Sequence, residues 1–392
     1  MKKYAGNFSR GIIVLWRLNL HFIRKSIGML NHPVTKLILL FTFLAFSGWS
    51  CQNPEKQTKP RVKVGVYYFD GWAGNNKNAD NPDEPWAKNV PTHVTKRMVE
   101  DFPDREPVWG WRDDSLSIME KQIDLAADNG IEFFAFCWYW RDTNGPINPE
   151  AIENLYLHNS LNLYMKAKNK DKIKFCLLVA NHKGAEITGT DNWEKATEYW
   201  MKYFKDPQHF KVNDKPLVII YHPTGIDNDA LARMQEISKK QGLEGLSIAG
   251  CDNAPDQNFN YKTHYNLGAG KFAGSEEHDY TLLAEAHKKE WKGSEAQPYI
   301  PEVTVGWDKR PWENKDGSGR QDWYFPRSPE KFKSFLTDAI TWMDEHPTQT
   351  TRERVVLIYA WNELGEGGYL VPTKGDPEAS LLKVIKNVVS GK

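Results

Sequence analysis

The stretch that decides the fold reads VVLIYAWNELGEGGY and occupies residues 355–369. Its first four residues are apolar and mostly β-branched, which predicts a buried strand. Two carboxylates three residues apart, Glu363 and Glu366, follow that strand. Residues three apart in an extended chain point to opposite faces. The glycines around Glu366 therefore predict a tight turn that brings both carboxylates to one side.

Two carboxylates that meet at a strand end beside aromatic residues suit glycoside hydrolysis. One protonates the leaving oxygen, and the other acts as base or nucleophile. Most Glu-x-x-Glu pairs are solvated charges on a helix or loop, and that alternative stays open here. The buried strand ahead of the pair, with Trp361 and Tyr369 on either side of it, favours a catalytic role.

Residues 1–50 have the pattern of an export segment. They contain seven Lys or Arg and no Asp or Glu, and residues 37–46 form an apolar run. Such a run is too short to span a bilayer, which takes about 20 residues. The run is followed by small residues and Cys51, which resembles the lipid-modified cysteine of bacterial lipoproteins. We predict an exported protein whose partner is the membrane: a lipid anchor at Cys51 attaches it to the bacterial outer membrane, on the periplasmic face or the cell surface. An uncleaved membrane anchor is the alternative.

The domain prediction has three parts. Residues 1–50 form the signal and lipoprotein export segment, residues 51–61 a polar tether, and residues 62–392 a single catalytic domain. Met29 would give an export segment of ordinary length, so residues 1–28 are a candidate misassigned start.

The charge and cysteine content exclude some functions. Residues 51–392 carry 44 basic and 51 acidic side chains, a net charge of −7, and no basic patch, which argues against a nucleic-acid partner. Cys137, Cys176 and Cys251 lie in or just after apolar runs and are interpreted as small buried hydrophobes. A Cys137–Cys176 disulfide is the alternative.

Strand-like and helix-like segments alternate along residues 62–392. The predicted strands are 62–69, 131–140, 173–180, 216–221, 246–250, 263–267, 299–305 and 354–361. The predicted helices are 115–129, 149–168, 191–204 (capped by Asp191), 227–241, 276–292, 328–345 and 377–389. Eight strands alternating with helices predict an α/β fold, a (β/α)₈ TIM barrel. The weakest part is 251–275, which has a strand but no clear helix before it. An open doubly wound sheet is the alternative, although no Gly-x-Gly-x-x-Gly follows the first strand.

Aromatic and hydrogen-bonding residues gather at the predicted carboxyl ends of these strands, where barrels place their chemistry. Sugars need flat faces for their C–H surfaces and polar groups for their hydroxyls. The predicted substrate-binding residues are Tyr67, Tyr68, Asp70, Trp138, Tyr139, Trp140, Asn181, His182, Tyr221, Asp252, Tyr265, Trp307, Asp308, Trp361, Asn362 and Tyr369. For any one aromatic residue, filling of the barrel core is the alternative.

Other chemistries find little support. The chain has no His-x-His, His-Glu-x-x-His or Cys-x-x-Cys, so we predict no metal and no other cofactor. Convergence of His182, His222 and His264 from three strand ends is the only metal alternative. No Gly-x-Ser-x-Gly marks a nucleophilic serine.

Residues 361–367, WNELGEG, resemble the catalytic segment of glycoside hydrolase family 99. Further pieces resemble the family-99-like, WbsX-like proteins: QIDLA at 122–126, FCWYW at 136–140, KPLVIIY at 215–221 and GWD at 306–308. Together with the end of the motif at Pro372, these pieces span about residues 63–375. Each is weak alone, and their order and spacing make the set specific.

The resemblance implies a (β/α)₈ barrel and retaining cleavage of an α-linked glycan, without a metal in the catalytic step. In family 99 proper the substrates are α-mannosides cut within the chain. Carried over, Glu363 is the base on the sugar's own 2-hydroxyl, which attacks the anomeric carbon to form an anhydro-sugar. Glu366 is the acid and later the base. Such a pair should have its pKa values pushed apart, with that of the acid raised.

The sequence departs from family 99 proper at three positions. Leu364 and Gly365 stand where that family has Trp-His, and His182 stands where relatives often carry a glutamate. These changes surround the sugar-binding surface. The resemblance therefore predicts an α-mannoside-like glycan, with the exact sugar and the choice between internal (endo) and terminal cleavage left open.

Two other functions compete with the hydrolase. A WbsX-like glycosyltransferase would need a diphosphate site, usually an Asp-x-Asp motif or a helix N-terminus with basic residues. Export would also separate it from sugar nucleotides. A non-catalytic surface glycan-binding protein would use the same aromatic ring of strand ends, but has no use for an acid/base pair.

Overall fold

The computed structural model describes residues 61–140, 148–223, 225–252, 256–267, 276–313 and 323–391. The chain divides into two units, residues 1–59 and 60–392, and everything described below belongs to the second. The predicted export segment and Cys51 lie outside the described residues.

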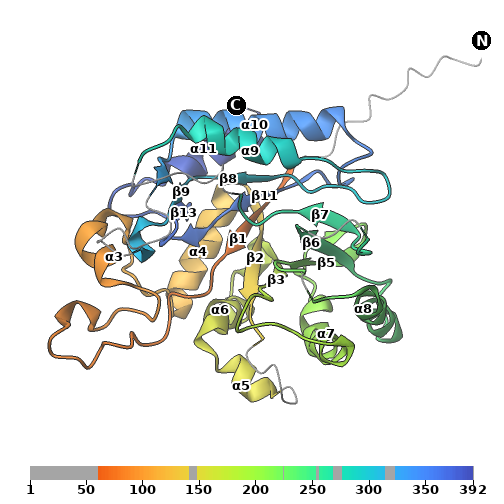
Figure 1. Ribbon diagram of the computed structural model, residues 1–392, viewed down its shortest axis with the longest axis horizontal. Coiled ribbons are helices and arrows are strands. Elements are labelled where there is room, and N and C mark those ends of the chain that lie inside the picture. Colours follow the sequence, from red (N-terminus) through yellow and green to blue (C-terminus); the bar gives the residue numbers. More distant parts are fainter. Residues whose placement is uncertain are drawn as a thin grey trace, which may run out of the picture. The chain divides into compact units, whose positions relative to one another are not determined.

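Eight parallel strands form the centre of the domain (Figure 1). They are β1 (Lys63–Tyr68), β2 (Ile131–Trp138), β3 (Lys174–Val179), β5 (Lys215–Ile220), β6 (Ser247–Cys251), β7 (Tyr261–Thr263), β8 (Glu302–Thr304) and β11 (Val355–Tyr359). Their order in the sheet is β7-β6-β5-β3-β2-β1-β11-β8. The first and last strands of the chain therefore pair: Lys63 lies opposite Val355 and Val66 opposite Ile358.

The two edge strands of this sheet approach each other through the segment that leads into β8. Lys262 N donates to Pro298 O at 2.9 Å, and Ile300 N donates to Lys262 O at 2.8 Å. The Thr263 hydroxyl adds a bond to Ile300 O at 2.9 Å. The eight strands thus form a nearly closed barrel, which confirms the predicted fold class.

Helices surround the barrel. They are α3 (Lys96–Asp101), α4 (Leu116–Asp128), α5 (Pro149–Glu153), α6 (Asn159–Lys166), α7 (Thr190–Phe204), α8 (Asn228–Lys240), α9 (Tyr280–Glu290), α10 (Pro329–Glu345) and α11 (Ser380–Val389). In Figure 1, α9, α10 and α11 gather along one side, at the top, and α7 and α8 lie together at the lower right. Side-chain caps begin several of them: Ser115 accepts from Ile118 N, and Asp227 accepts from Ala230 N. No helix in the described ranges is long and apolar enough to cross a membrane.

Several predicted elements differ in detail from those observed. The predicted strand 263–267 lies at 261–263, so Tyr265 falls beyond the strand end. The predicted helix 149–168 is divided into α5 and α6 by a 3₁₀ turn at Tyr156–His158. A residue distant in sequence caps α6 separately. The Asp70 carboxylate accepts from Ser160 N at 2.7 Å and from Leu161 N at 3.2 Å, so a new helix begins there. Asp191 does not cap α7, which begins one residue earlier, after Gly189.

Short elements that the periodicity did not predict lie at the carboxyl ends of the strands. These are α3, the pair β9 (Trp307–Asp308) and β10 (Tyr324–Phe325), and the pair β12 (Asn362–Glu363) and β13 (Gly368–Tyr369). A further two-residue strand, β4 (Lys211–Val212), pairs with β5. Two-residue strands are too short to show any alternation in sequence.

The three cysteines of the described residues are buried and free. The alternative of a Cys137–Cys176 disulfide is therefore wrong. Burial raises the pKa of all three thiols, which keeps them protonated and unreactive at neutral pH.

Candidate active site

Glu363 and Glu366 lie on a hairpin that directly follows β11. Strands β12 and β13 pair antiparallel, with Glu363 opposite Gly368 and Asn362 opposite Tyr369. Glu366 N donates to Glu363 O at 3.1 Å, which closes a β-turn between the two glutamates. The turn predicted from the glycines is present, and both carboxylates line one cavity.

The glycines of this hairpin are required because a side chain at these positions would clash with neighbouring residues, and at Gly367 also because of the backbone conformation. A Cβ at Gly365 would lie 2.0 Å from the Trp312 ring, and one at Gly368 would lie 2.1 Å from the Tyr359 ring. Gly367 has φ +77°, and its Cβ would lie 2.7 Å from Asp308 N. The aromatic rings beside the turn can therefore approach it only because side chains are absent there.

Asn362 fastens the hairpin to the end of β1. Phe69 N donates to its Oδ1 at 2.8 Å, and its Nδ2 donates to Phe69 O at 2.9 Å. The Trp361 indole donates to Gln122 Oε1 at 2.6 Å on helix α4. Both residues precede Glu363, so they set the direction in which the chain enters the turn.

Arg105 holds the other side of the turn. Its Nη1 donates to Leu364 O at 2.9 Å and to Asp308 O at 3.0 Å, and its Nη2 pairs with the Asp308 carboxylate. Asp308 N in turn donates to Glu366 O at 2.7 Å. The backbone around both glutamates is thus bonded to a buried ion pair.

Each glutamate receives a hydrogen bond from its own tyrosine. The Tyr265 hydroxyl donates to Glu363 Oε1 at 2.5 Å, and the Tyr359 hydroxyl donates to Glu366 Oε2 at 2.5 Å. Lys309 Nζ lies 3.8 Å from Glu366 Oε1. Glu363 Oε2 is buried and has no hydrogen-bond partner among the described residues. One acceptor oxygen of the pair is therefore left for a bound molecule.

Burial raises the pKa of both carboxyl groups. The pKa of Glu363 lies well above its usual value because the neighbouring Glu366 adds to the effect of burial, and Tyr265 and Lys309 offset only part of it. The pKa of Glu366 is also raised by burial, but the Tyr359 hydroxyl and Lys309 counteract this. Burial and the closeness of the two glutamates thus leave both carboxyl groups with a raised pKa, Glu366 as well as Glu363.

The cavity in front of the pair has a volume of about 150 Å³. It is lined by Phe69, Cys137, Tyr139, Leu178, Ala180, His182, Tyr221, Tyr265, Trp312, Glu363 and Glu366. Of the predicted site residues, the structure brings together Glu363, Glu366, Tyr139, His182, Tyr221 and Tyr265. The Tyr221 and Tyr265 rings contact each other, with their centroids 4.9 Å apart, so two of the predicted strand ends meet.

Other predicted residues point away from the cavity because side chains alternate along a strand. Tyr68 donates to Asp113 and Gln122, and Trp138 stacks on His158 outside the barrel. Trp140 lies against Trp138, and Trp361 faces α4. Tyr67 points inward but is fully buried below the cavity, where it donates to His264 O at 2.8 Å.

The remaining predicted residues are engaged with the protein. Asp70 caps α6, and Asn181 bridges His222 O at 2.5 Å and Ile187 N at 2.8 Å. Asp252 pairs with His264 at another surface hollow. Asn362 and Asp308 hold the hairpin as described above. Trp307 packs near Tyr359, and Tyr369 lies under the Arg327 guanidinium, whose Cζ is 3.8 Å from the ring centre.

Sequence reasoning missed part of the site. Phe69, Cys137, Leu178 and Ala180 line the cavity but were not predicted. Strict alternation would have found Phe69 from Tyr67 and Cys137 from Tyr139, since residues two apart share a face. Trp312, Lys309 and the hydroxyl of Tyr359 had no such signal. Lys309 and Trp312 lie at the two ends of a short 3₁₀ turn (Arg310–Trp312), which has no repeating pattern, and Tyr359 reads as an ordinary strand residue. His182, His222 and His264 join no group of three or more metal-binding side chains in the described part of the chain.

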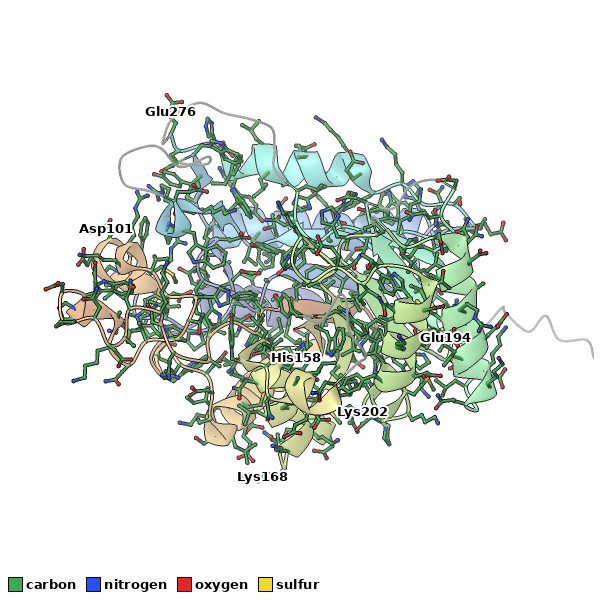
Figure 2. All side chains as sticks on the ribbon, turned by 60° about the horizontal axis from the view of Figure 1, so that its bottom comes forward. Asp101, His158, Lys168, Glu194, Lys202 and Glu276 are labelled. Atoms are coloured by element: carbon green, nitrogen blue, oxygen red, sulfur yellow. The ribbon has the colours of Figure 1, made fainter. Side chains whose placement is uncertain are left out.

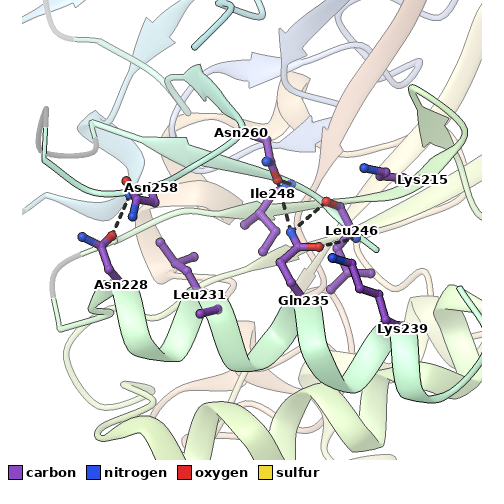
Figure 3. Close-up of a pocket in the computed structure, with 10 residues that line it drawn as sticks. Lys215, Asn228, Leu231, Gln235, Lys239, Leu246, Ile248, Asn258 and Asn260 are labelled. Atoms are coloured by element: carbon purple, nitrogen blue, oxygen red, sulfur yellow. Dashed lines mark hydrogen bonds between the residues drawn. The ribbon is translucent and has the colours of Figure 1, made fainter. Parts of the chain in front are cut away.

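A separate groove of about 300 Å³ lies on the flank of the barrel, between α8 and β6 (Figure 3). Gln235 spans it: its Nε2 donates to Leu246 O at 2.9 Å, and its Oε1 accepts from Leu246 N at 2.8 Å. The chain's Asp-x-Asp tripeptide, Asp227-Asn228-Asp229, lies at the N-terminal end of α8. There Asp227 caps the helix, and Asn228 Oδ1 accepts from Asn258 N at 2.7 Å. These polar groups fasten α8 to the barrel and lie apart from the glutamates.

Relatives were found by sequence in Xanthomonas campestris pv. campestris. The uncharacterized protein WxcX of strain B100 is 24% identical over 289 residues, which cover 65% of this chain and 39% of that protein. A second strain carries a protein with the same degree of similarity. The match thus spans well under half the length of these relatives.

Solved structures share the fold. The GH99 endo-alpha-mannosidase from Bacteroides thetaiotaomicron superposes with a TM-score of 0.56 at 16% identity, covering 84% of this chain and 96% of that one. A glycoside hydrolase-like protein superposes with a TM-score of 0.55 at 14% identity, covering 86% and 96%. The fold is therefore that of the GH99 barrels, as the resemblance implied.

The family comparison covers most of the domain. The family model described as Glycosyltransferase WbsX matches residues 112–384, which include β2 to β11, the hairpin and both glutamates. This confirms the WbsX-like resemblance of the sequence motifs: the chain belongs to the WbsX family.

Proposed function

We propose that the protein is a retaining glycoside hydrolase that cleaves an α-linked glycan at the Glu363/Glu366 hairpin. The observation that carries the proposal is the state of Glu363. Its Oε1 is held by Tyr265, while its Oε2 is buried without a partner among the described residues. A buried acceptor without a donor costs free energy, and a sugar hydroxyl in the cavity would supply that donor.

In the first step Glu363 acts as base on the sugar's own 2-hydroxyl. The hydroxyl proton goes to Glu363, the freed oxygen forms a bond to the anomeric carbon, and the bond to the leaving oxygen breaks. Glu366 gives its proton to that leaving oxygen. A base works best with a pKa near the working pH, so the raised pKa of Glu363 suits abstraction of a hydroxyl proton.

In the second step the roles reverse. Glu366 takes a proton from water, whose oxygen attacks the anomeric carbon, and the bond to the 2-oxygen breaks. Glu363 returns its proton to that oxygen. Two inversions at the anomeric carbon give net retention, and both carboxyl groups recover their starting protonation states.

The cycle needs one proton on the pair, and it must begin on Glu366. Burial raises the pKa of both carboxyl groups, and the neighbouring Glu366 adds to the rise for Glu363, so the pair favours keeping a proton. A 2-hydroxyl that donates to Glu363 Oε2 stabilises the ionised form of Glu363 and so favours the state in which Glu366 carries the proton. Substrate binding would therefore set the working protonation state, and a 2-deoxy glycan would lose both the nucleophile and this trigger.

The first test is turnover by the full-length chain on α-mannans, N-glycans and other polysaccharides, with the anomeric protons followed by NMR. We expect a product that first appears in the parent α configuration and is absent with Glu366→Gln and Glu363→Gln. The exposed Glu290→Gln is the matched control and should keep full activity. Full activity of Glu366→Gln on a natural substrate would overturn the assignment. α-Mannosides are the first probe because the structurally similar Bacteroides enzyme is an endo-alpha-mannosidase.

The family description favours a second candidate, a glycosyltransferase. A transferase that uses a sugar nucleotide needs a site for the diphosphate. In the Asp-x-Asp tripeptide of this chain, the Asp227 carboxylate accepts from Ala230 N and caps α8. Calorimetry with UDP- and GDP-sugars distinguishes the two candidates: micromolar binding that Glu363→Gln leaves unchanged would favour the transferase. Tight binding of a glycan without turnover, also unchanged in Glu363→Gln, would favour a non-catalytic glycan-binding protein.

A further inference from the structure

A second hollow adjoins the catalytic cavity at Trp312. It has a volume of about 560 Å³ and is lined chiefly by the segment between β1 and α3, including Trp86, Thr92 and His93. Trp312 lines both this hollow and the catalytic cavity. We call it the Trp86 hollow.

Aromatic side chains connect the two spaces. Phe69 lines the catalytic cavity. The centroid of its ring lies 6.1 Å from that of the Trp312 ring and 5.2 Å from that of the His93 ring. The ring centroids of His93 and Trp312 lie 6.5 Å apart, and both residues line the Trp86 hollow. A ligand that leaves the catalytic cavity beside Trp312 therefore meets a continuous series of aromatic rings.

The walls of the Trp86 hollow are fixed by hydrogen bonds. Asn76 is buried, and its Nδ2 donates to Val94 O at 2.7 Å and to Pro91 O at 3.3 Å. The Thr95 hydroxyl donates to Pro311 O at 2.7 Å, and Arg97 Nη1 donates to Glu313 O at 3.0 Å. These two bonds bracket Trp312 and tie its loop to α3, whose last residue, Asp101, is labelled in Figure 2. The hollow is thus largely formed before any ligand binds.

Size and chemistry match the continuation of a sugar chain. Pockets that enclose small organic ligands measure roughly 300–1,000 Å³. The catalytic cavity of about 150 Å³ is below this range, whereas the Trp86 hollow of about 560 Å³ lies within it. Half-buried tryptophan faces suit the C–H surface of a pyranose, and Asn78, Thr92 and Lys96 offer partners for its hydroxyls.

We infer that the Trp86 hollow is a subsite for further residues of the glycan whose scissile bond lies at the glutamate pair. This inference rests on the proposed function and narrows its substrate class: the enzyme prefers oligosaccharides that extend past Trp312 over short glycosides. Trp86 is a specificity residue in this assignment and takes no part in the chemical step.

The test is the dependence of kcat/KM on chain length. The full-length chain and its Trp86→Ala variant are assayed on α-mannooligosaccharides of two to six residues, or on the corresponding fragments of whichever α-glycan the screen identifies. We expect Trp86→Ala to lower kcat/KM about tenfold on the longest members, mainly through KM, and to leave the disaccharide unchanged. Trp86→Phe, which keeps an aromatic face, should recover most of the loss. The control is Trp109→Ala, a half-buried tryptophan of the same segment that does not line the hollow.

The outcomes separate the two levels of the proposal. Turnover by the wild-type chain with the same length dependence in Trp86→Ala would overturn the subsite and leave the hydrolase intact. An equal loss on the disaccharide, or an equal effect of Trp109→Ala, would also overturn it. If the wild-type chain neither cleaves nor binds any member of the ladder, the proposed function fails and this inference fails with it.

Discussion

Tyr265 and Tyr359 occupy one oxygen of each glutamate and leave the remaining oxygens to differ in their surroundings. Glu363 Oε2 is buried without a partner among the described residues, whereas Glu366 Oε1 lies 3.8 Å from Lys309 Nζ. Lys309 lowers the pKa of both carboxyl groups, whereas the charge of Glu366 raises that of Glu363. Two of the groups that surround these glutamates, Tyr265 and Lys309, lie more than 50 positions away in sequence.

This arrangement predicts the effect of Lys309→Met on the pH profile. Lys309 lowers the pKa of both glutamates, so its removal raises both. In the proposed mechanism, Glu363 must be ionised and Glu366 protonated for turnover. Both the acidic and the alkaline limb of kcat/KM against pH should therefore move to higher pH. The matched control is Lys331→Met, whose ammonium pairs with Asp279. A profile in Lys309→Met that coincides with the wild type would contradict this role.

At the scale of the element, the β12–β13 hairpin is the part of the site that the sequence predicted best. The pattern of strand, glutamate, glycine, glutamate and glycine has one compact solution, a tight turn at a strand end. What the pattern does not contain is the support of that turn. Arg105, Asp308 and Trp312 contact it from elements with no periodic signal, and they meet it only in the folded barrel.

The same limit explains the uneven prediction of the cavity lining. The aromatic run 138–140 suggested three sugar-facing residues, but alternation leaves only Tyr139 of this run among the residues that line the cavity. The barrel fold could be predicted because the strands of a parallel barrel are buried on both faces and therefore appear in the sequence as apolar runs, of which there are eight. The segment between β1 and α4 has no repeating pattern, so the hollow that it forms with Trp312 was not visible in the sequence.

The support of the hairpin predicts a strong effect of Arg105→Met. This change removes two hydrogen bonds to backbone oxygens and one partner of a buried carboxylate. Breaking one partner of a buried pair costs roughly 3–5 kcal/mol, here lessened because Arg310 also pairs with Asp308. We expect denaturant unfolding to show a loss near the lower end of this range, together with a large fall in kcat. Arg105→Lys keeps the charge without the planar fork, so it should restore part of the stability and less of the activity. Wild-type kcat in Arg105→Met would refute a positioning role.

At the scale of the whole domain, buried ionisable groups set the pH dependence of stability. Glu302 and His287 form a fully buried pair, with Nδ1 of the imidazole 2.9 Å from the carboxylate. Burial raises the pKa of Glu302 to about 8 and lowers that of His287 to about 3. At neutral pH both groups are therefore held uncharged inside the fold.

The signs of the two shifts oppose each other. The folded state keeps a proton on Glu302 that the unfolded state loses above about pH 4.5, so the free energy of unfolding falls as the pH rises from about 4.5 to 8. For His287 it falls as the pH drops from about 6.5 to 3. The two slopes oppose each other where these ranges overlap, between about pH 4.5 and 6.5, so their joint contribution is level there and declines on either side. Asp113, whose pKa burial raises to about 7, adds a further fall in the free energy of unfolding as the pH rises toward 7.

We therefore expect Glu302→Gln to reduce the loss of stability between pH 6.5 and pH 8 relative to the wild type. Urea unfolding at half-unit intervals measures this, with the exposed Glu290→Gln as the control that should follow the wild type. Asp113 remains in the variant, so a smaller decline should persist. A decline as steep as that of the wild type would show that Glu302 does not hold its proton in the folded state.

Export and lipid anchoring are properties of the whole chain that we propose from the sequence alone. Cys51 follows the apolar run of the predicted export segment. In a bacterial host we expect the full-length chain in the outer-membrane fraction with incorporated palmitate, and Cys51→Ala without palmitate. Cys176→Ala, which removes a buried thiol, is the control and should still be labelled. Labelling of Cys51→Ala equal to the wild type would place the lipid elsewhere.

The bond between Asn362 and the backbone of Phe69 has a consequence for how activity arises during folding. It joins the end of β1 to the start of the hairpin that carries Glu363, across the pair of strands that lie farthest apart in the chain. Closing the loop between these strands is the entropically costly step of assembly. Asn362 can bond to Phe69 only when that step is complete. If the proposed function holds, recovery of turnover after refolding should therefore report the pairing of the first and last strands of the barrel, and a partly assembled chain should lack it.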